Sequence, residues 1–432
     1  MKRALILVAL LACAGVARAE LTIEITQGAG QAVPVAVVPF GWDGSGEAPL
    51  DVAAVIGADL ARSGRFEPLE RRDMLSRPTR GVEIDFDDWR MVGTDLIVVG
   101  GLVREAEDDY TLQFQLFDVL RGEQLVGYRM PASKRGLRLA AHRAADMIYE
   151  EITGIPGVFS TRIAYITAEG EAPDQRVYRL IVSDADGANQ YTIVESAQPL
   201  MSPTWSPDGR RIAYVSFEGN RSAVWVQTLR TGNRQRLSRE EGINGAPVWS
   251  PDGRRIALTL SGADGNPDIW VMTVATGQKR RLTTNPAIDT EAAWAPDGES
   301  IYFTSDRSGG PQIYQVDVEG GAAARVTFEG RYNARPRISP DGSKLAVVHD
   351  DRGNYRIAVY DLENDLFQVL SDGRLDESPD FAPNGATLIY ATRQGDRGVL
   401  ATVSVDGTVK QRLASSGGDV REPVWSPFRQ DF

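Results

Sequence analysis

Short apolar runs separated by turn residues fill the chain from residue 162 to its end. One phrase recurs there, Trp-Ser-Pro-Asp-Gly, in complete, variant or truncated copies whose first residues are Trp205, Trp249, Trp294, Ile338, Phe381 and Trp425. The prolines of successive copies stand 44, 45, 44, 43 and 44 residues apart. Pro presets φ, Asp caps the turn and Gly accepts a positive φ, so the phrase predicts a hairpin turn. With three further strand-like runs per copy, each unit has the four short strands of a β-propeller blade.

The two ends of this repeat region predict how the ring closes. The run Arg162–Ile166 matches Arg211–Val215 of the second unit, yet no copy of the phrase precedes it. The final segment, Pro423–Pro427, has no unit after it. We therefore predict that this segment supplies the missing inner strand of the first blade, which closes six blades over residues 162–432. Closure of this kind removes sheet edges that would otherwise pair with other chains.

The preceding part of the chain mixes two periodicities, which predicts a small α/β domain over residues 33–153. Strand-like and helical runs alternate, in the order 35–40 (strand), 50–63 (helix), 96–99 and 110–118 (strands), and 137–153 (helix). Residues 154–161 would link this domain to the ring. The predicted fold class is thus an α/β N-terminal domain followed by a six-bladed all-β propeller closed by the C-terminal strand.

The first nineteen residues have the pattern of an export signal. A charged start, an apolar stretch and a small-residue cleavage site follow one another at Lys2-Arg3, Ala4–Ala14 and Ala17-Arg18-Ala19. The apolar stretch is too short for a membrane anchor, since a spanning helix needs roughly 20 residues. A competing interpretation, in which Cys13 is acylated as in lipoproteins, fits less well because of the leucine two positions before it. We expect residues 1–19 to be removed and a mature chain that begins at Glu20, acts outside the cytoplasm and does not span a membrane.

Charge and rare residues exclude several classes of function. The net charge is −12 and no run of Lys or Arg exceeds three residues, so nucleic acid is not an expected partner. The chain has two histidines, His142 and His349, and one cysteine, which leaves few ways to build a zinc site or a Ser-His or Cys-His pair. The acidic loop 264–268 resembles the start of an EF-hand, but Ile269 replaces its glycine. We therefore expect no catalytic residues, no metal site and no cofactor, and favour a binding protein.

Two functions of other classes remain as alternatives. Related repeats form the propellers of prolyl-peptidase-like hydrolases, but this chain has no G-x-S-x-G nucleophile motif. The second alternative is a periplasmic propeller that binds a sugar or another small ligand in its channel.

The order of parts resembles the TolB family, the periplasmic β-propellers of the Tol–Pal system of Gram-negative bacteria. The resemblance spans the whole chain and is carried by the stretches 38–40, 59–66, 198–203, 244–247 and 375–379. It implies a non-enzymatic periplasmic protein that binds the peptidoglycan-associated lipoprotein Pal through the propeller and TolA through the mature N-terminus. It also implies roles in outer-membrane invagination at cell division and in envelope integrity, a monomer within the Tol–Pal complex, and use of the same surface by bacteriocins.

The loops that enter the inner strands converge near the ring axis, where propellers usually bind. Side chains there need not fill the core, and the candidates are Met201, Asn244, Thr290, Glu291, Asn333, Arg335, Asp376, Glu377 and Arg421. The family resemblance assigns this mouth to Pal. One departure is Ile243, which stands where TolB proteins can carry a histidine. The repeated tryptophans, in contrast, are expected to fill space between blades.

The segment at the predicted mature N-terminus, residues 20–32, has the pattern of an arm. Apolar and polar residues alternate in Glu20, Leu21, Thr22, Ile23, Glu24 and Ile25. Such a segment could add as a strand to the sheet edge of a partner, and the family resemblance makes that partner TolA. The alternative is that the segment is the first strand of the α/β domain. An arm that docks on its own domain and is then released would satisfy both.

Overall fold

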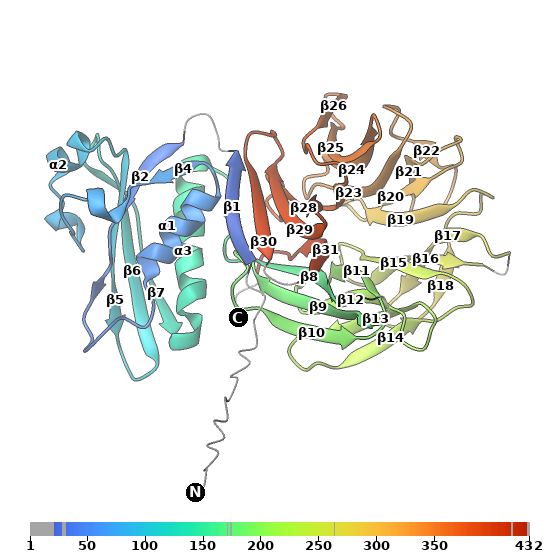
Figure 1. The fold of residues 1–432 in the computed structure, drawn as a ribbon, viewed down its shortest axis with the longest axis horizontal. Coiled ribbons are helices and arrows are strands. Elements are labelled where there is room, and N and C mark those ends of the chain that lie inside the picture. The colour runs from blue at the N-terminus through green and yellow to red at the C-terminus, as the bar shows by residue number, and fades with distance from the viewer. Residues whose placement is uncertain are drawn as a thin grey trace, which may run out of the picture.

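The computed structural model describes residues 21–27, 32–170, 172, 175–262, 264–415 and 418–429. An α/β domain lies beside a six-bladed propeller, as predicted (Figure 1). The predicted leader, residues 1–19, and the arm residues Glu20 and 28–31 fall outside the described residues. None of the helices in this described part of the chain has the length and apolar character that a membrane crossing requires.

The α/β domain contains one sheet in the order β4-β2-β5-β6-β7, with β3 paired to β5. Its strands are β2 (Val33–Val37), β3 (Gly41–Trp42), β4 (Phe66–Pro68), β5 (Leu96–Arg104), β6 (Asp109–Asp118) and β7 (Glu123–Ser133). Its helices are α1 (Val52–Arg62), α2 (Phe86–Met91) and α3 (Leu137–Thr153), with 3-10 turns at Arg71–Asp73, Gly81–Glu83 and Lys134–Gly136. The strands β2, β4 and β5 are parallel, whereas β5, β6 and β7 form an antiparallel meander.

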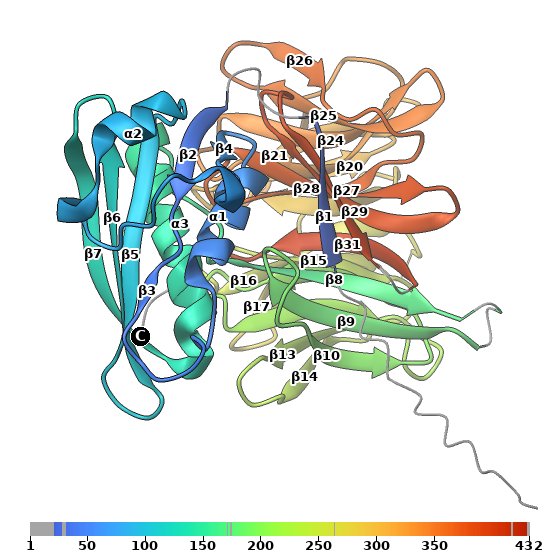
Figure 2. The ribbon, with the colours of Figure 1, turned by 60° about the vertical axis from the view of Figure 1, so that its left-hand side comes forward.

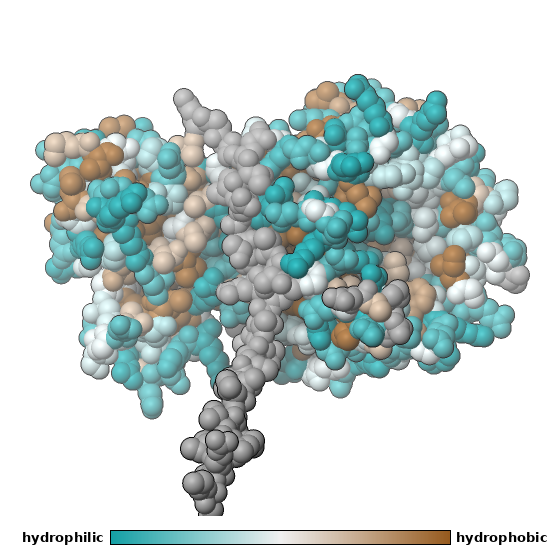
Figure 3. All heavy atoms as spheres, in the orientation of Figure 1, coloured by the Kyte–Doolittle hydropathy of each residue, from teal (hydrophilic) through white to brown (hydrophobic). Residues whose placement is uncertain are grey.

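Both faces of this sheet are buried over its parallel part because successive side chains point to opposite faces. Val35 and Val37 pack with α1 and α3, whereas Ala36 and Val38 pack with Trp89 of α2 on the other face. The helices α1 and α3 lie between this sheet and the propeller (Figure 2). On the face drawn in Figure 3, most propeller residues are hydrophilic and apolar residues are dispersed among them.

Each blade is an antiparallel sheet of four strands, and a fifth strand joins blade 6. Blade 1 contains β31 (Asp419–Trp425), β8 (Arg162–Glu169), β9 (Val177–Asp184) and β10 (Tyr191–Ser196). Blade 2 contains β11 (Leu200–Trp205), β12 (Arg211–Ser216), β13 (Ala223–Thr228) and β14 (Arg234–Ser238). Blade 3 contains β15 (Asn244–Trp249), β16 (Arg255–Ser261), β17 (Pro267–Thr273) and β18 (Lys279–Arg281).

The remaining three blades follow the same order along the chain. Blade 4 contains β19 (Asp289–Trp294), β20 (Ser300–Ser305), β21 (Gln312–Asp317) and β22 (Ala324–Arg325). Blade 5 contains β23 (Asn333–Ile338), β24 (Lys344–Asp351), β25 (Asn354–Asp361) and β26 (Leu366–Val369). Blade 6 contains β27 (Glu377–Phe381), β28 (Thr387–Gln394), β29 (Arg397–Ser404), β30 (Lys410–Ser415) and, outermost, β1 (Leu21–Gln27).

The strand β31 closes the ring. It pairs antiparallel with β8 as the inner strand of blade 1, which confirms the predicted closure by the final segment. Ser426 fastens the end of this pairing: its backbone N–H donates to the Arg162 carbonyl at 2.8 Å, and its hydroxyl accepts from the Arg162 N–H at 2.9 Å. The Trp425 indole donates to the Thr161 hydroxyl at 2.7 Å. The first strand of the repeat region, β8, and its last strand, β31, thus share one sheet.

The strand β1 lies on the propeller, not on the α/β domain. It pairs antiparallel with β30, from Leu21 opposite Ser415 to Gln27 opposite Lys410 (Figure 1). The alternative that this segment is the first strand of the α/β domain is therefore wrong. In this position β1 covers the edge that β30 would otherwise leave unpaired.

The serine of the repeated phrase closes the turn together with the aspartate. In blade 3 the buried Ser250 hydroxyl donates to the Asp252 carboxylate and accepts from the Arg255 N–H at 2.9 Å. Ser206 and Ser339 make the same contacts in blades 2 and 5. The sequence pattern points to Pro, Asp and Gly as the turn residues, and the structure adds the serine.

Replacing Ser250 by alanine is expected to lower the free energy of unfolding of the propeller by about 1–3 kcal/mol, because the Arg255 N–H loses its partner inside the turn. Blade 4 offers the matched control, since alanine stands naturally at the same place in its copy of the phrase. There, Ala295→Ser is expected to leave the stability unchanged or to raise it. Urea unfolding followed by tryptophan fluorescence measures both variants. Similar losses in the two would contradict this role for the serine.

Candidate functional site

Each inner strand of the propeller carries one irregularity at the same place. The pairing of β11, β15, β19, β23, β27 and β31 with the next strand shifts register near its middle. At the shift one residue has φ between 42° and 56°, and these six residues, here called the bulge ring, are Ser202, Ala246, Glu291, Arg335, Ser378 and Glu422. None is glycine, although this conformation favours glycine. Backbone strain that recurs in all six blades points to a site.

The bulge ring lines a cavity of about 830 Å³ at the mouth of the propeller. A bulge re-aims the side chain at its position, and six blades related by the ring direct one such position each into the same space. This volume lies in the usual range for binding pockets, about 300–1,000 Å³. The repeat therefore builds one shared site out of six separate blades.

Apolar side chains surround this ring. Met201 and Ile243 line the cavity and are 36% and 46% exposed. Ile288 and Leu375, which are 49% and 40% exposed, hold the corresponding places just before β19 and β27. Exposed large apolar side chains gathered at one opening mark an interaction surface. The mouth combines this apolar rim with a charged interior.

Arg335 is the centre of the polar contacts in the ring. Its Nε lies 2.8 Å from Glu291 Oε1, its backbone N–H donates to Glu291 Oε2 at 3.1 Å, and its guanidinium contacts the Ser378 hydroxyl. Burial opposes the charge on this guanidinium, but the carboxylates of Glu291, Glu422 and Glu377 outweigh burial and raise its pKa. Burial raises the pKa of Glu422, and Arg335 partly offsets that effect. Three carboxylates thus surround this one guanidinium, whereas the cavity wall as a whole is balanced, because Arg221 and Arg337 line it together with Glu241.

The structure places five of the predicted mouth residues on the cavity wall: Met201, Asn244, Thr290, Glu291 and Arg335. Glu377 and Arg421 stand one position before ring residues and are half-buried beside the wall. Arg421 pairs with Asp419 of its own strand at 2.9 Å.

Three of the predicted residues are almost fully buried and are engaged inside the blades, although one of them, Asn244, also lines the cavity. Asn244, Asn333 and Asp376 are at most 1% exposed. The Asn244 side chain accepts from the Glu240 N–H and donates to the Glu240 carbonyl, so it closes the loop that enters β15. Asn333 donates to the Glu329 carbonyl and Asp376 accepts from the Gly373 N–H, each in the equivalent loop. These loops bend sharply and their backbone groups need internal partners.

Residue polarity alone does not identify four members of the ring, namely Ser202, Ala246, Ser378 and Glu422. A different signal does: each ring residue lies three positions before the first residue of a Trp-Ser-Pro-Asp-Gly copy, as Glu291 lies before Trp294. The bulge belongs to the geometry of the blade, so its position follows the repeat and not the chemistry of the residue.

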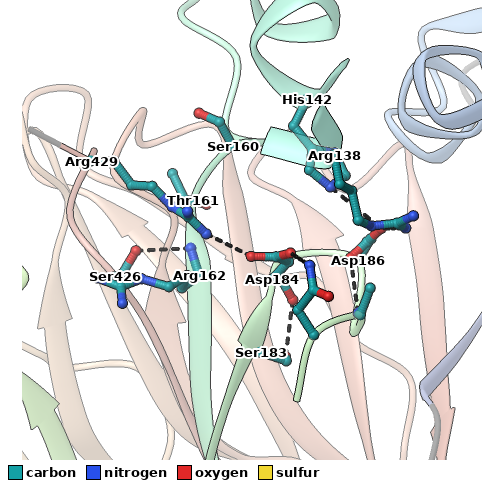
Figure 4. Close-up of polar contacts among 12 residues, drawn as sticks. Arg138, His142, Ser160, Thr161, Arg162, Ser183, Asp184, Asp186, Ser426 and Arg429 are labelled. Carbon is teal, nitrogen blue, oxygen red and sulfur yellow. Dashed lines mark hydrogen bonds and ion pairs between the residues drawn. The ribbon is translucent and has the colours of Figure 1, made fainter. Parts of the chain in front are cut away.

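Both histidines lie away from the mouth. His349 is buried in blade 5, where its Nδ1 lies 2.9 Å from Asn333 Oδ1, and burial lowers its pKa. His142 is buried on α3, where that helix meets blade 1 (Figure 4).

One group among the described residues is compact enough to be considered for a metal ion: Asp59, His142 and Asp186, whose candidate atoms lie within 4.8 Å of one another. Arg62 already pairs with Asp59 at 2.7 Å, and Arg138 pairs with Asp186. Two guanidiniums therefore neutralise the two carboxylates, and this arrangement does not fit a divalent cation.

Fold and site together define a class of protein: a six-bladed β-propeller with an N-terminal α/β domain and a recognition cavity at the mouth of the ring. Two family models match the chain, the TolB amino-terminal domain over residues 21–125 and the TolB beta propeller domain over residues 149–429. The chain belongs to the TolB family, which confirms the resemblance found in the sequence.

Relatives match along nearly the whole chain. It is 56% identical over 414 residues to the Tol-Pal system protein TolB of Thioalkalivibrio sulfidiphilus, with 95% of each chain covered. It is 56% identical over 409 residues to the protein of the same name from Nitrosococcus oceani, with 95% of this chain and 94% of that one covered. The crystal structure of TolB from Acinetobacter baumannii is similar with a TM-score of 0.87 at 40% identity, over 94% of this chain and 100% of that one.

Proposed function

We propose that this protein is a non-enzymatic periplasmic scaffold of the Tol–Pal system that binds Pal at the propeller mouth and TolA through its N-terminal arm. In this role it supports outer-membrane invagination during cell division and the integrity of the envelope. The observation that carries the proposal is the bulge ring, because it gathers one position from every blade into a single cavity. The names of the relatives, Tol-Pal system protein TolB, provide the system.

The mouth suits a segment of a protein better than a free small ligand. Its apolar rim extends outward from the cavity wall at Ile243 to residues such as Ile288, which a small ligand in the channel would leave uncovered. Apolar contact area with a few polar anchors is the anatomy of a protein–protein interface. The excess of carboxylates around Arg335 favours a partner segment that brings amide or cationic donors into the ring.

The backbone pairing of β1 supports the arm as the TolA-binding segment. β1 is the last strand of its sheet, so a single ladder of backbone hydrogen bonds joins it to β30. The sheet edge of a partner offers the same bonds. Exchange of one ladder for another would release the arm without unfolding blade 6.

The positions of the histidines support a role without catalysis. The mouth presents Glu291, Arg335 and Glu422, whereas the hydrolases with related propellers use a histidine beside a nucleophile. His349 is engaged with Asn333 inside blade 5, and His142 is engaged with Asp59 where α3 meets blade 1.

Calorimetric titration of residues 20–432 with soluble Pal tests the proposal. We expect binding in the micromolar range or tighter, about −8 kcal/mol or more favourable. A variant that lacks residues 20–31 is expected to bind Pal equally well and to lose TolA, because the two sites lie on different parts of the propeller. No binding of Pal to either form would reject the mouth as its site. TolA binding that survives the deletion would reject the arm.

A further inference from the structure

The long strand β7 leaves one edge of the α/β sheet open. It pairs with β6 alone and lies at the outer rim of the domain (Figure 2). None of its eleven residues is buried. Among the described residues, no backbone hydrogen bond from an element other than β6 reaches this strand. An edge of this kind offers its free N–H and C=O groups to any extended segment.

The other outer edges of the molecule are short or covered. The last strands of blades 1 to 5, β10, β14, β18, β22 and β26, have between two and six residues. The strand β4, at the opposite edge of the α/β sheet, has three. In blade 6, β30 is covered by β1, the arm that is proposed above to bind a partner. Short or covered edges protect a protein against pairing with other chains. The length of β7 departs from this rule, and such departures are expected at functional sites.

The regular part of this edge runs from Val126 to Met130. Before it, the pairing with β6 shifts register, because Leu116 pairs with Val126 whereas the next residue pairs with Gln124. After it, Pro131 has no N–H to donate. Bulges and prolines both limit the pairing of an edge strand. A segment added to β7 would therefore pair with residues 126–130.

Side chains of this part of β7 alternate between the two faces of the sheet. On one face, Tyr128 is 47% exposed, and its ring centroid lies 6.0 Å from that of Phe114. Gly127 and Arg129 belong to the opposite face. All three β7 residues contribute to the wall of a cavity of about 810 Å³. An added segment would direct alternate side chains towards Tyr128 and into this cavity.

Arg129 determines the charge that suits an added segment. With the Gln113 amide oriented so that its oxygen faces the guanidinium, this oxygen accepts from Arg129 Nη2 at 2.7 Å and from Nε at 3.3 Å. In the described part of the chain no carboxylate forms an ion pair with Arg129. Arg80 on the same wall already pairs with Glu83, and Asp43 lies beside β5, two strands away from β7. Because opposite charges stabilise a cross-strand pair, the position opposite Arg129 favours a carboxylate.

The molecule already contains one strand added to an edge in this way. β1 (Leu21–Gln27) pairs with β30, and in that register Glu24 stands opposite Arg412. Its sequence alternates apolar and polar residues. The strand β1 is thus a chemical model for the kind of segment that β7 would accept.

We propose that β7 is a strand-acceptor site for a partner protein, whose extended segment pairs with Val126–Met130 and places a carboxylate opposite Arg129. Backbone hydrogen bonds supply the affinity of such a site, and the alternating side chains supply its specificity. The site lies on the α/β domain, apart from the propeller mouth and from the arm on blade 6. It gives the α/β domain a binding role of its own.

Two dye-labelled peptides test the charge at this edge on residues 20–432. One has the sequence Thr-Val-Glu-Val-Thr, and the other has lysine in place of the glutamate. In fluorescence anisotropy we expect the glutamate peptide to bind about fivefold more tightly, and Arg129→Glu to reverse this preference. Arg121→Glu, at an exposed position in the turn between β6 and β7, makes the same change of charge and is expected to preserve it. No binding of either peptide, or an unchanged preference in Arg129→Glu, would overturn the proposal.

Hydrogen exchange followed by mass spectrometry locates the bound peptide. Saturating glutamate peptide is expected to slow the exchange of backbone amides in residues 123–133 and to leave β10, the outer strand of blade 1, unchanged. Exchange in residues 123–133 that the peptide does not slow would refute the site. Sedimentation of the chain alone separates a partner protein from a second copy of this chain, and we expect a monomer. A dimer that Arg129→Glu dissociates would assign the edge to a second copy and overturn its assignment to a partner protein.

Discussion

Deleting residues 419–432 is expected to abolish the folded propeller. The deletion removes β31, the inner strand of blade 1, and uncovers the edge of β8 next to the ring axis. Val420 and Val424 of this strand belong to two different hydrophobic cores, so the deletion leaves a cavity in each core. A cooperative domain with a net stability of about 5–15 kcal/mol does not survive the loss of an inner strand. Circular dichroism and thermal melting of the truncated mature chain measure the effect.

Deleting β1 is the matched comparison, because it removes one strand of similar length from the opposite edge of a blade. β1 is outermost in blade 6 and pairs with one strand, so its loss opens a sheet edge but leaves the four other strands of the blade paired. We expect this chain to melt cooperatively, within about 8 °C of the parent. If the chain without β31 melted cooperatively at the melting temperature of the parent, blade 1 would fold without its closing strand, which would contradict the prediction.

The substitution Arg335→Glu is expected to weaken Pal binding at least about 100-fold, or by about 3 kcal/mol. It places a carboxylate among those of Glu291, Glu377 and Glu422, which already surround this position, and it leaves the carboxylate of Glu291 without its partner at 2.8 Å. Like charges placed together in an interface cost several kcal/mol. Calorimetric titration with soluble Pal measures the loss. Adding Glu291→Arg restores the pair in reverse and is expected to recover part of the affinity.

The control for this charge reversal is Arg254→Glu, which makes the same change at an exposed position in the turn between β15 and β16. It is expected to leave Pal binding unchanged. Thermal melting of both variants separates loss of binding from loss of fold. Pal binding by a folded Arg335→Glu protein at parental affinity would remove the bulge ring from the site.

The sequence predicts the blades well because a repeated turn sets them. Pro207 and its counterparts recur at nearly constant spacing, and each turn depends only on residues within the phrase. Closure by the last segment is predictable for the same reason, since a half-unit at each end can only be completed by the other. The loops before the inner strands are placed by the same repeat, so their positions also follow from the sequence.

Contacts that depend on the three-dimensional arrangement of the chain cannot be predicted in this way. Polarity singles out Asn333 as readily as Glu291, yet the first is used inside its own loop and the second lines the cavity. β1 binds its neighbour through backbone hydrogen bonds, and any unpaired sheet edge offers the same bonds. The sequence therefore does not show which edge β1 joins. The partner of His142 lies in a turn 44 residues further along the chain, and nothing in the local pattern of Asp186 marks it.

In the described part of the chain, polar contacts join the N-terminal part to turns of two blades. Asp186 lies in blade 1, whereas Asp406 and Asn384 lie in blade 6, where Asn384 donates to the Pro156 carbonyl at 2.8 Å. These are the two blades that meet where the ring closes. A propeller that unfolds by separating there must first undock the α/β domain, so these contacts raise the barrier to unfolding. The domain therefore lengthens the lifetime of the folded ring, a kinetic contribution that an unfolding rate would show.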